Sequence, residues 1–231
     1  MTTHGMIHSH SALQKYRQCP QAFYRLKVLK DIKDVMGAAA DYGDKVHKAI
    51  EARVKSDVAL PPEFRQYEPL CQYIVTIPGT HHCELKLGMN DRGEGRTFFA
   101  KGPTAGGDNW LRGIIDFLAI NGSHGTIIDY KTGKYRGDDG QPAICSALAF
   151  ANFPELETIT ARFLYLPESY IAKYVYTRQG FSELIALVQR TDIEIEWSHT
   201  SNAWPTRPSG LCGWCPVGNS GQCADAQKRK R

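Results

Sequence analysis

The stretch from Arg112 to Lys134, RGIIDFLAINGSHGTIIDYKTGK, contains two apolar runs of the kind that form buried strands. Each run carries an aspartate where a buried strand usually has valine or isoleucine, and a lysine follows the second aspartate two positions later. Because unpaired charge is costly in such surroundings, Asp116, Asp129 and Lys131 call for an explanation.

The turn between the two runs determines which residues face each other. Asn121-Gly122-Ser123-His124 has glycine at the first central position, which favours a type II′ hairpin. In that register Asp116 lies opposite Asp129. Since side chains alternate along a strand, both aspartates and Lys131 are predicted to emerge from one face, whereas a five-residue loop would separate the aspartates.

Two neighbouring carboxylates repel each other unless a cation lies between them. Carboxylate oxygens suit Mg²⁺ or Mn²⁺, and a lysine beside such an ion could orient or deprotonate a water molecule. The alternative is a buried Asp–Lys ion pair, which leaves the second carboxylate unexplained. The pattern therefore favours a metal site.

Two other segments offer ligands to the same ion. In YGDKVHKAIE, Gly43, His47 and Glu51 recur every four residues and share one face of an expected helix, so His47 could supply an imidazole. Glu84, in HHCELKL, is a further acidic candidate on an expected strand. The ordinary alternatives are a surface or core histidine and a half-exposed strand glutamate.

The rest of the sequence predicts helices and strands in the order β-β-β-α-β-β-α after an N-terminal helical part. The expected helices are Ser11–Gln18 (capped by Ser9 or Ser11), Gln21–Lys30, Gly43–Lys55, Gln141–Phe153 and Ser182–Trp197. The expected strands are His81–Leu87, Leu111–Ile120, Thr126–Tyr130, Ile159–Leu166 and Ile171–Thr177, with 57–80 irregular and Asp91–Asp108 a surface loop. This order predicts a mixed α/β fold with one central mixed sheet flanked by helices.

Composition bounds the class of protein. The 231 residues are 42% hydrophobic and 23% charged, as in an ordinary globular protein. The sequence has no apolar run of membrane-spanning length and no apolar leader at its N-terminus, so we expect a cytoplasmic protein with mostly reduced cysteines and no membrane contact. The formal charge of +4 and the basic end Lys228–Arg231 permit a nucleic-acid partner, although a solvated tail is equally compatible.

The cysteines are unevenly placed. Cys71, Cys83 and Cys145 have the surroundings of ordinary core residues. Cys212-x-x-Cys215 and Cys223 crowd into SGLCGWCPVGNSGQC, and Cys19, before Pro20, is the natural fourth ligand. Four thiolates suit tetrahedral zinc, and free thiols in a mobile tail are the alternative.

A family resemblance emerges from the order of the motifs SALQKYRQCPQAFY, GDKVHKAIE, CELKL, RGIIDFL, IIDYKTGK, QPAICSALAFANFPE and SGLCGWCP. From about Ser9 to Cys223 the chain resembles the PD-(D/E)XK nuclease superfamily, specifically its RecB-like exonuclease branch, which includes phage and CRISPR-associated adaptation nucleases. The resemblance implies a restriction-endonuclease-like core. It also implies roles for individual residues: His47, Asp116, Asp129 and the Tyr130 carbonyl as metal ligands, Lys131 as catalytic lysine, and Gln141 as an active-site or DNA-contacting residue.

The same resemblance bears on the cysteines. It implies a [4Fe–4S] cluster on Cys19, Cys212, Cys215 and Cys223 that joins the chain ends, although the gap before Cys223 is longer than usual. Cys145 occupies a position where that branch usually has tyrosine. The expected organisation is one nuclease domain over 1–231, with 1–35 and 205–225 as a metal-cluster subdomain and 226–231 as a basic tail.

These observations together predict a Mg²⁺- or Mn²⁺-dependent DNA nuclease. We expect an exonuclease that acts on free or single-stranded DNA ends in recombination, repair or phage DNA metabolism, with recombination or replication proteins as candidate partners. One alternative is a non-catalytic DNA-binding module with a structural cysteine-bound metal, which the intact Asp116, Asp129 and Lys131 set disfavours. Another is a restriction-type endonuclease, for which no separate recognition domain is evident.

Overall fold

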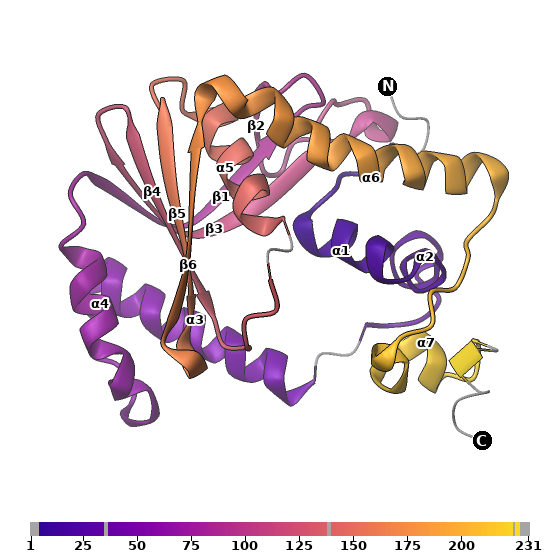
Figure 1. Ribbon diagram of the computed structural model, residues 1–231, viewed down its shortest axis with the longest axis horizontal. Helices are drawn as coiled ribbons and strands as arrows, with labels where there is room; N and C mark the ends of the chain where they lie inside the picture. The colour runs from indigo at the N-terminus through magenta and orange to yellow at the C-terminus, as the bar shows by residue number, and fades with distance from the viewer. Residues whose placement is uncertain (1–4, 35–36, 138–139, 224, 227–231) are drawn as a thin grey trace.

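A six-stranded mixed sheet forms the centre of the molecule (Figure 1). The computed structural model describes residues 5–34, 37–137, 140–223 and 225–226, so the basic residues Lys228–Arg231 lie outside the described part. The sheet order is β2-β1-β3-β4-β5-β6. The strands are β1 (Thr80–Met89), β2 (Gly95–Thr97), β3 (Leu111–Asn121), β4 (His124–Lys131), β5 (Thr158–Tyr165) and β6 (Tyr170–Thr177). All neighbours are antiparallel except β4 and β5, which confirms the predicted mixed sheet.

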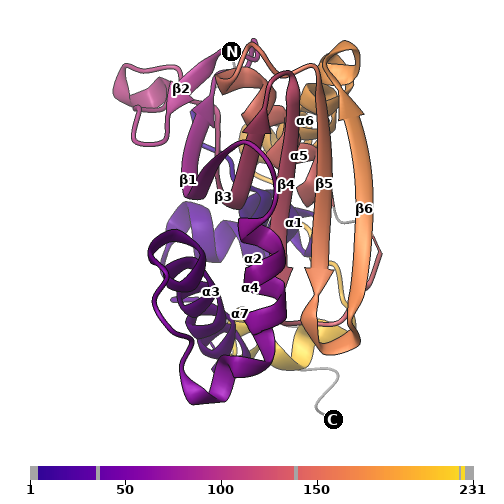
Figure 2. The ribbon, with the colours of Figure 1, turned by 90° about the vertical axis from the view of Figure 1, so that its left-hand side faces the viewer.

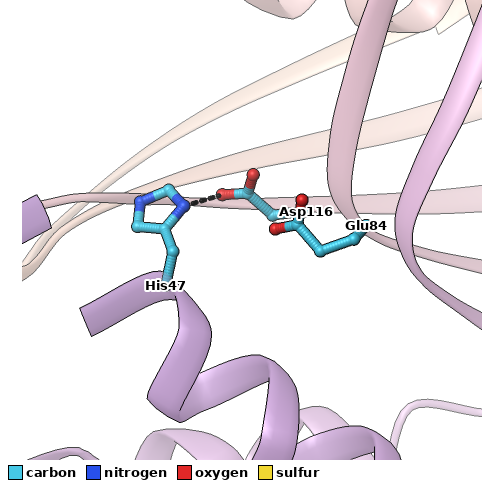
Figure 3. A group of neighbouring side chains, drawn as sticks. All are labelled: His47, Glu84 and Asp116. Atoms are coloured by element: carbon cyan, nitrogen blue, oxygen red, sulfur yellow. Dashed lines mark ion pairs between the residues drawn. The ribbon is translucent and has the colours of Figure 1, made fainter. Parts of the chain in front are cut away.

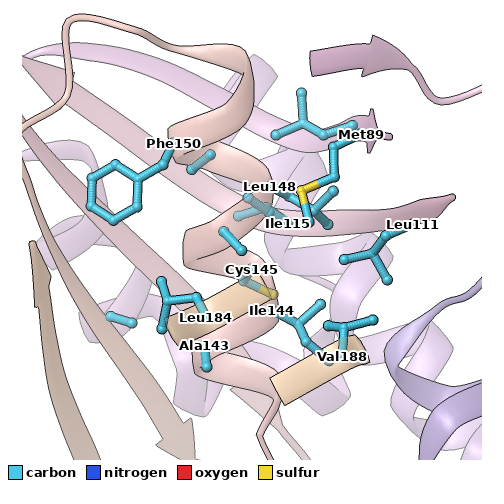
Figure 4. Packing of buried hydrophobic residues seen from close by; sticks show 14 of the residues in the cluster. Met89, Leu111, Ile115, Ala143, Ile144, Cys145, Leu148, Phe150, Leu184 and Val188 are labelled. Atoms are coloured by element: carbon cyan, nitrogen blue, oxygen red, sulfur yellow. The ribbon is translucent and has the colours of Figure 1, made fainter. Parts of the chain in front are cut away.

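The parallel pair exists because a helix crosses between its strands. A parallel connection needs a crossover, here α5 (Gln141–Asn152), between β4 and β5. Every residue of α5 from Pro142 to Phe150 is buried, because the helix lies between the sheet and the long helix α6 (Phe181–Ser201). Figure 4 shows this core, in which Leu148 and Ile115 meet between helix and sheet.

Two helices cover the opposite face of the sheet. These are α3 (Ala38–Ser56) and α4 (Glu68–Val75), seen in front of the strands in Figure 2. Val46 and Ile50 of α3 pack with Phe117 and Ile128 of the hairpin in a second core, and all four are fully buried. The helix that carries His47 is therefore fixed to the sheet by apolar contacts on both sides of that residue.

The prediction that residues 57–80 are irregular was wrong. They contain the 3-10 helix η2 (Pro62–Tyr67) and α4, whose Cys71 and Ile74 are buried in the second core. An eight-residue helix has little stability of its own, so its apolar stripe becomes decisive only once the sheet is present to cover it.

The expected surface loop Asp91–Asp108 likewise contains regular structure. It includes the edge strand β2, paired to β1 through Leu87↔Thr97, and the 3-10 turn η3 (Pro103–Ala105). The strand has only three residues and no apolar alternation. It is held instead by Arg96, which donates to Asp108 at 2.7 and 2.6 Å.

The hairpin register is as predicted. Asn121 pairs with His124 and Phe117 with Ile128. Gly122 has a positive φ of 58° and the φ of Ser123 is not positive, as in a type II′ turn. The turn therefore sets which residues reach the end of the hairpin.

The N-terminal helices and the C-terminal segment lie next to each other beside the sheet (Figure 1). The N-terminal elements are α1 (His10–Gln18), capped by Ser9, α2 (Pro20–Phe23) and a π-helical turn η1 (Tyr24–Leu29), and the C-terminal ones are η6 (Gly210–Trp214) and α7 (Pro216–Asn219). The Gln21 N–H donates to the Pro205 carbonyl at 3.2 Å, and Trp204 stacks on Tyr24. Short 3-10 turns η4 (Leu166–Glu168) and η5 (Arg178–Gly180) flank β6. In the described residues, none of the helices is long and apolar enough to cross a membrane.

Candidate active site

The candidate site forms where the strands β1 and β3 reverse their faces together. Ile115 packs in the core beneath α5, yet Phe117, two residues on, packs in the core beneath α3. Leu85 and Cys83 of β1, which pair with these two residues, divide in the same way. The reversal falls on Glu84 and Asp116. Glu84 has φ of 49°, a left-handed conformation that costs energy for a residue with a side chain.

His47 on α3 joins the hairpin to the helix layer. Its Nε2 lies 2.6 Å from the carbonyl oxygen of Tyr130, and its Nδ1 lies 3.3 Å from Oδ2 of Asp116. The same carboxylate oxygen accepts the Tyr130 N–H at 3.0 Å. The backbone pairing of β3 with β4 ends at Phe117↔Ile128. Beyond that pair, the Asp116 side chain accepts the hydrogen bond of the Tyr130 N–H.

These contacts assemble three potential metal ligands. One ligand atom each from His47, Glu84 and Asp116 lie within 4.8 Å of one another, from three different elements (Figure 3). An imidazole and two carboxylates are donors that Mg²⁺ or Mn²⁺ accepts. The donor set and its spacing therefore fit a hard divalent cation.

The electrostatics of the group indicate an excess of negative charge from the neighbouring carboxylates. Burial raises the pKa of Glu84, and the nearby charge of Asp116 raises it further. Burial would lower the pKa of His47, but the hydrogen bond and charge of Asp116, together with Asp129 and the Tyr130 carbonyl, raise it to about 9. Without a metal ion, a protonated His47 supplies the positive charge between the carboxylates.

A second group adjoins the first, and its side chains contact the start of α5 instead of α3. Lys131 Nζ is 2.6 Å from Oδ2 of Asp129 and donates to the Gln141 Oε1 at 2.7 Å. The Gln141 Nε2 in turn donates to Oδ1 of Asp129 at 2.9 Å. Gln141 is the first residue of α5, so the crossover helix fixes the amide that connects the two charged side chains.

Burial dominates the protonation of this second group. It raises the pKa of Asp129 to about 7, with a further increase from the charge of Asp116 and a partial offset from Lys131. For Lys131, burial lowers the pKa, but the charge and hydrogen bond of Asp129 together with the charge of Asp116 outweigh it and leave the pKa raised. Lys131 therefore stays protonated, 5.2 Å from the centre of the Phe163 ring.

The predicted shared face of Asp116, Asp129 and Lys131 requires correction. Asp116 bonds to His47 from the α3 layer, whereas Asp129 and Lys131 contact Gln141 from the α5 layer. The backbone of Tyr130 connects the two groups, since its N–H and carbonyl bind the first group and its neighbours belong to the second. Strict alternation fails here because β3 reverses at Asp116.

A cleft of about 400 Å³ opens beside the first group and gives it access to solvent. Gly43, Ile114 and Thr132 are among the residues that line it. A Cβ on Gly43 would lie 3.0 Å from Thr132 Oγ1, so the glycine permits close approach of the loop after β4. Sequence reasoning identified Gly43 but missed Thr132 and Ile114. The only sequence signal for Thr132 would have been Gly43, the small residue that lies opposite it.

The four predicted cysteines surround a separate cavity of about 280 Å³. Cys19 approaches from the N-terminal helices, and Cys212, Cys215 and Cys223 approach from the C-terminal segment. The Ser209 N–H donates to Cys212 Sγ at 3.3 Å. Among the described residues, no three of these sulfurs lie within 4.8 Å of one another. Cys145, in contrast, is buried in α5.

The family model described as the PD-(D/E)XK nuclease superfamily matches residues 8–81 and 81–220. The chain belongs to this nuclease superfamily. The six-stranded mixed sheet flanked by helices agrees with a restriction-endonuclease-like fold for the nuclease.

Two solved structures are similar to this chain at low sequence identity. One, from Eubacterium rectale and named "Putative exonuclease", is 16% identical with a TM-score of 0.52, over 90% of this nuclease and 86% of that chain. Another, named SSO0001, is 14% identical with a TM-score of 0.49, over 94% of this nuclease and 85% of that chain. Among curated proteins no match was found.

Proposed function

We propose that this nuclease hydrolyses DNA in a reaction that depends on Mg²⁺ or Mn²⁺. The observation that carries the proposal is the convergence of His47, Glu84 and Asp116 within 4.8 Å, next to the Asp129, Lys131 and Gln141 group. An ordinary buried Asp–Lys pair accounts for the second group, but it gives no reason for an additional histidine and two more carboxylates.

The first group, with Asp129 and the Tyr130 carbonyl, would hold the ion. When bound, the ion supplies Lewis acidity at the scissile phosphate and lowers the pKa of a coordinated water. Its arrival would replace the proton of His47, whose Nε2 now bonds to the Tyr130 carbonyl. That competition between proton and metal is expected wherever imidazole is a ligand.

Lys131 and Gln141 would act on the water and the strand. Lys131 is oriented by two acceptors, Asp129 and Gln141, so its ammonium group has a fixed direction. In the proposed role it positions the attacking water and stabilises the negative charge that develops on the phosphate. Gln141 keeps the lysine and Asp129 in register and contacts the DNA from the start of α5.

We propose further that the enzyme is an exonuclease that works on DNA ends in recombination, repair or phage DNA metabolism, together with recombination or replication proteins. Support comes from the order of its RecB-like motifs and from its likeness to the chain named as an exonuclease. We place it in the cytoplasm, on the sequence grounds given above.

The test is cleavage of end-labelled linear DNA and closed circular DNA by protein first treated with EDTA. With Mg²⁺ or Mn²⁺ restored, linear DNA should be degraded and the circle should remain. Lys131→Ala should be inactive, whereas Lys134→Ala, an exposed lysine of the same segment, should act as wild type. Cutting of the circle would indicate a restriction-type endonuclease. Binding of DNA without cleavage in the presence of either metal ion would indicate a non-catalytic DNA-binding module.

We also propose that Cys19, Cys212, Cys215 and Cys223 hold a [4Fe–4S] cluster within a subdomain of residues 1–35 and 205–225. Tetrahedral zinc would bring its thiolates to within about 3.8 Å of one another. Cysteines from both ends of the chain around one cavity suit a cluster, in which four irons and four sulfides would lie between the cysteines.

Colour and metal content test this second proposal. Protein prepared without oxygen should be brown, with absorption near about 400 nm, and Cys19→Ser should lose the colour. Cys83→Ser is the matched control, because Cys83 lies on β1 away from the cavity, and it should stay coloured. Colourless wild-type protein with one zinc per chain would establish the alternative metal instead.

A further inference from the structure

Beyond the cleft, the sheet carries an exposed strip of basic and aromatic side chains. Lys86 of β1 pairs directly with Ile114 of β3, each two residues beyond a carboxylate of the metal-ligand group. Two residues correspond to about 7 Å along a strand. Ile114 is 39% exposed and lines the cleft, so the strip continues from the candidate site.

The loop after β2 adds two aromatic rings to this strip. Phe99 is 77% exposed, and the Lys86 ammonium lies 5.8 Å from the centre of its ring. Phe98 packs edge-on against Phe99 at 5.1 Å and lies beneath the Arg112 guanidinium at 5.0 Å. These four residues, Lys86, Phe98, Phe99 and Arg112, are called the basic–aromatic strip below.

Most of the Phe99 ring remains exposed despite its contacts with Phe98 and Lys86. Exposed ring surface adds little to folding, whereas it offers a flat face on which a nucleobase can stack. The strip also matches the charge of nucleic acid. The nearest carboxylates of that loop, Glu94 and Asp108, are both bound by Arg96, which leaves Lys86 and Arg112 to face a phosphate backbone.

Lys86 also lies close to the metal-ligand group, because it is two strand residues, or about 7 Å, beyond Glu84. A strand whose phosphate lies at the cleft would therefore have its next phosphate within reach of Lys86. Such alternation of a cation and a ring is typical of single-strand channels.

We propose that the basic–aromatic strip binds the unpaired nucleotides that flank the scissile phosphate, with one base stacked on Phe99 and one phosphate at Lys86. The proposal rests on the proposed function and specifies its substrate as single-stranded DNA or a frayed end. A duplex keeps its bases stacked on one another and offers no free face to Phe99.

The test measures binding by fluorescence anisotropy in EDTA, so that no strand is cut. Phe99→Ala should bind a single-stranded oligonucleotide about 5- to 100-fold more weakly than wild type. It should match wild type on a strand of the same length that lacks bases, and on blunt duplex. Trp197→Ala, an exposed aromatic of α6, is the matched control and should bind every ligand as wild type does.

Salt dependence separates the two contacts. Lys86→Gln should reduce the slope of log affinity against log salt by about 0.7, the value for one phosphate contact on a single strand. Phe99→Ala should leave that slope unchanged, because stacking releases no counterion. Lys173→Gln, an exposed lysine on the opposite edge strand β6, should leave both affinity and slope unchanged.

The outcomes distinguish this inference from the proposed function. Full single-strand affinity in Phe99→Ala, or no binding of single strands by wild type, would overturn the inference even if linear DNA is cleaved. If Phe99→Ala binds single strands more weakly but the wild-type protein cleaves no DNA, the strip is a single-strand binding site and the proposed nuclease function is wrong. A dimer that dissociates on Phe99→Ala, with DNA binding unchanged, would identify the strip as a self-association surface and overturn the inference.

Discussion

The β3–β4 hairpin and the cysteine cavity both gather candidate metal ligands, but different forces hold them in place. The ligands of the hairpin lie on strands and on α3, between two large apolar cores. The cavity is bordered by a small cluster whose buried members, among the described residues, are Ala22, Leu26 and Val217, with Cys19, Cys215 and Cys223 at its margin. The first site is therefore preformed by folding, whereas the second depends more on what the thiolates bind.

Polar contacts show the same contrast. Around Tyr130 the backbone itself binds His47 and Asp116, at 2.6 and 3.0 Å, so these two side chains are fixed without an ion. At the cavity the described chain ends are joined by hydrogen bonds such as Gln21 N–H to the Pro205 carbonyl and Arg207 Nη1 to the Arg17 carbonyl, which do not involve the cysteine side chains. A site built on strands keeps its geometry when the metal leaves, and a site that joins chain ends loses part of its order.

The largest expected effect is on catalysis. Asp116→Asn should lower the cleavage rate at least about 100-fold, since it removes a ligand charge from the group. The fold should persist, because the substitution also relieves the repulsion with Glu84. Single-turnover cleavage and circular dichroism on the same preparation check both halves. Near wild-type turnover would remove Asp116 from the site.

The next effect is on stability and compares the two cores. Ile50→Ala, on the buried face of α3, should lower the free energy of unfolding by about 2–5 kcal/mol. Leu26→Ala, in the small cluster beside the cavity, should lower the global value by less and instead loosen the chain ends. Urea unfolding with hydrogen exchange measures both. Equal global losses would contradict the proposed division of stability.

A smaller and more local effect is expected from cluster removal. Cys19→Ser should accelerate amide exchange in residues 19–34 and 205–223 by about tenfold or more, the factor that corresponds to 1.4 kcal/mol of local stability. Amides of β3 and β4 should exchange as in wild type, because their pairing does not involve the cavity. Exchange that accelerates throughout the sheet would show that the two regions form one cooperative unit.

The smallest effect concerns the approach of α3 to the loop after β4. Gly43→Ala should lower cleavage a few-fold, because its Cβ would lie 3.0 Å from Thr132 Oγ1 and push the loop away. Stability should rise slightly, since alanine favours a helix by about 0.5–1 kcal/mol over glycine. Thr132→Ala in the same chain should restore the rate. If the double variant stays slow, the contact with Thr132 does not explain the need for glycine.

The hairpin was predictable from sequence because its information is local. A glycine at one turn position set the register, and the aspartates in apolar runs marked the candidate ligands. Apart from β2, the order of strands and helices likewise followed from periodicity, which predicted the mixed sheet.

The face reversal at Glu84 and the short helix α4 were not predictable, for a different reason. Nothing in the segment CELKL signals a left-handed residue, because the conformation of Glu84 depends on the face reversal of the neighbouring strand β3 at Asp116. Residues Cys71 and Ile74 form too short a stripe to predict a helix unless the sheet that covers them is known. Such features depend on tertiary contacts between strands distant in the sequence.

The most direct test of the preformed metal site is a crystal of the protein soaked in Mn²⁺ and measured for anomalous scattering. We expect one strong peak bound by Asp116 and His47, with the His47 to Tyr130 hydrogen bond broken and the strands otherwise in place. A Cys19→Ser crystal should show the same peak. No peak beside Asp116, with His47 still bonded to the Tyr130 carbonyl in excess Mn²⁺, would contradict it.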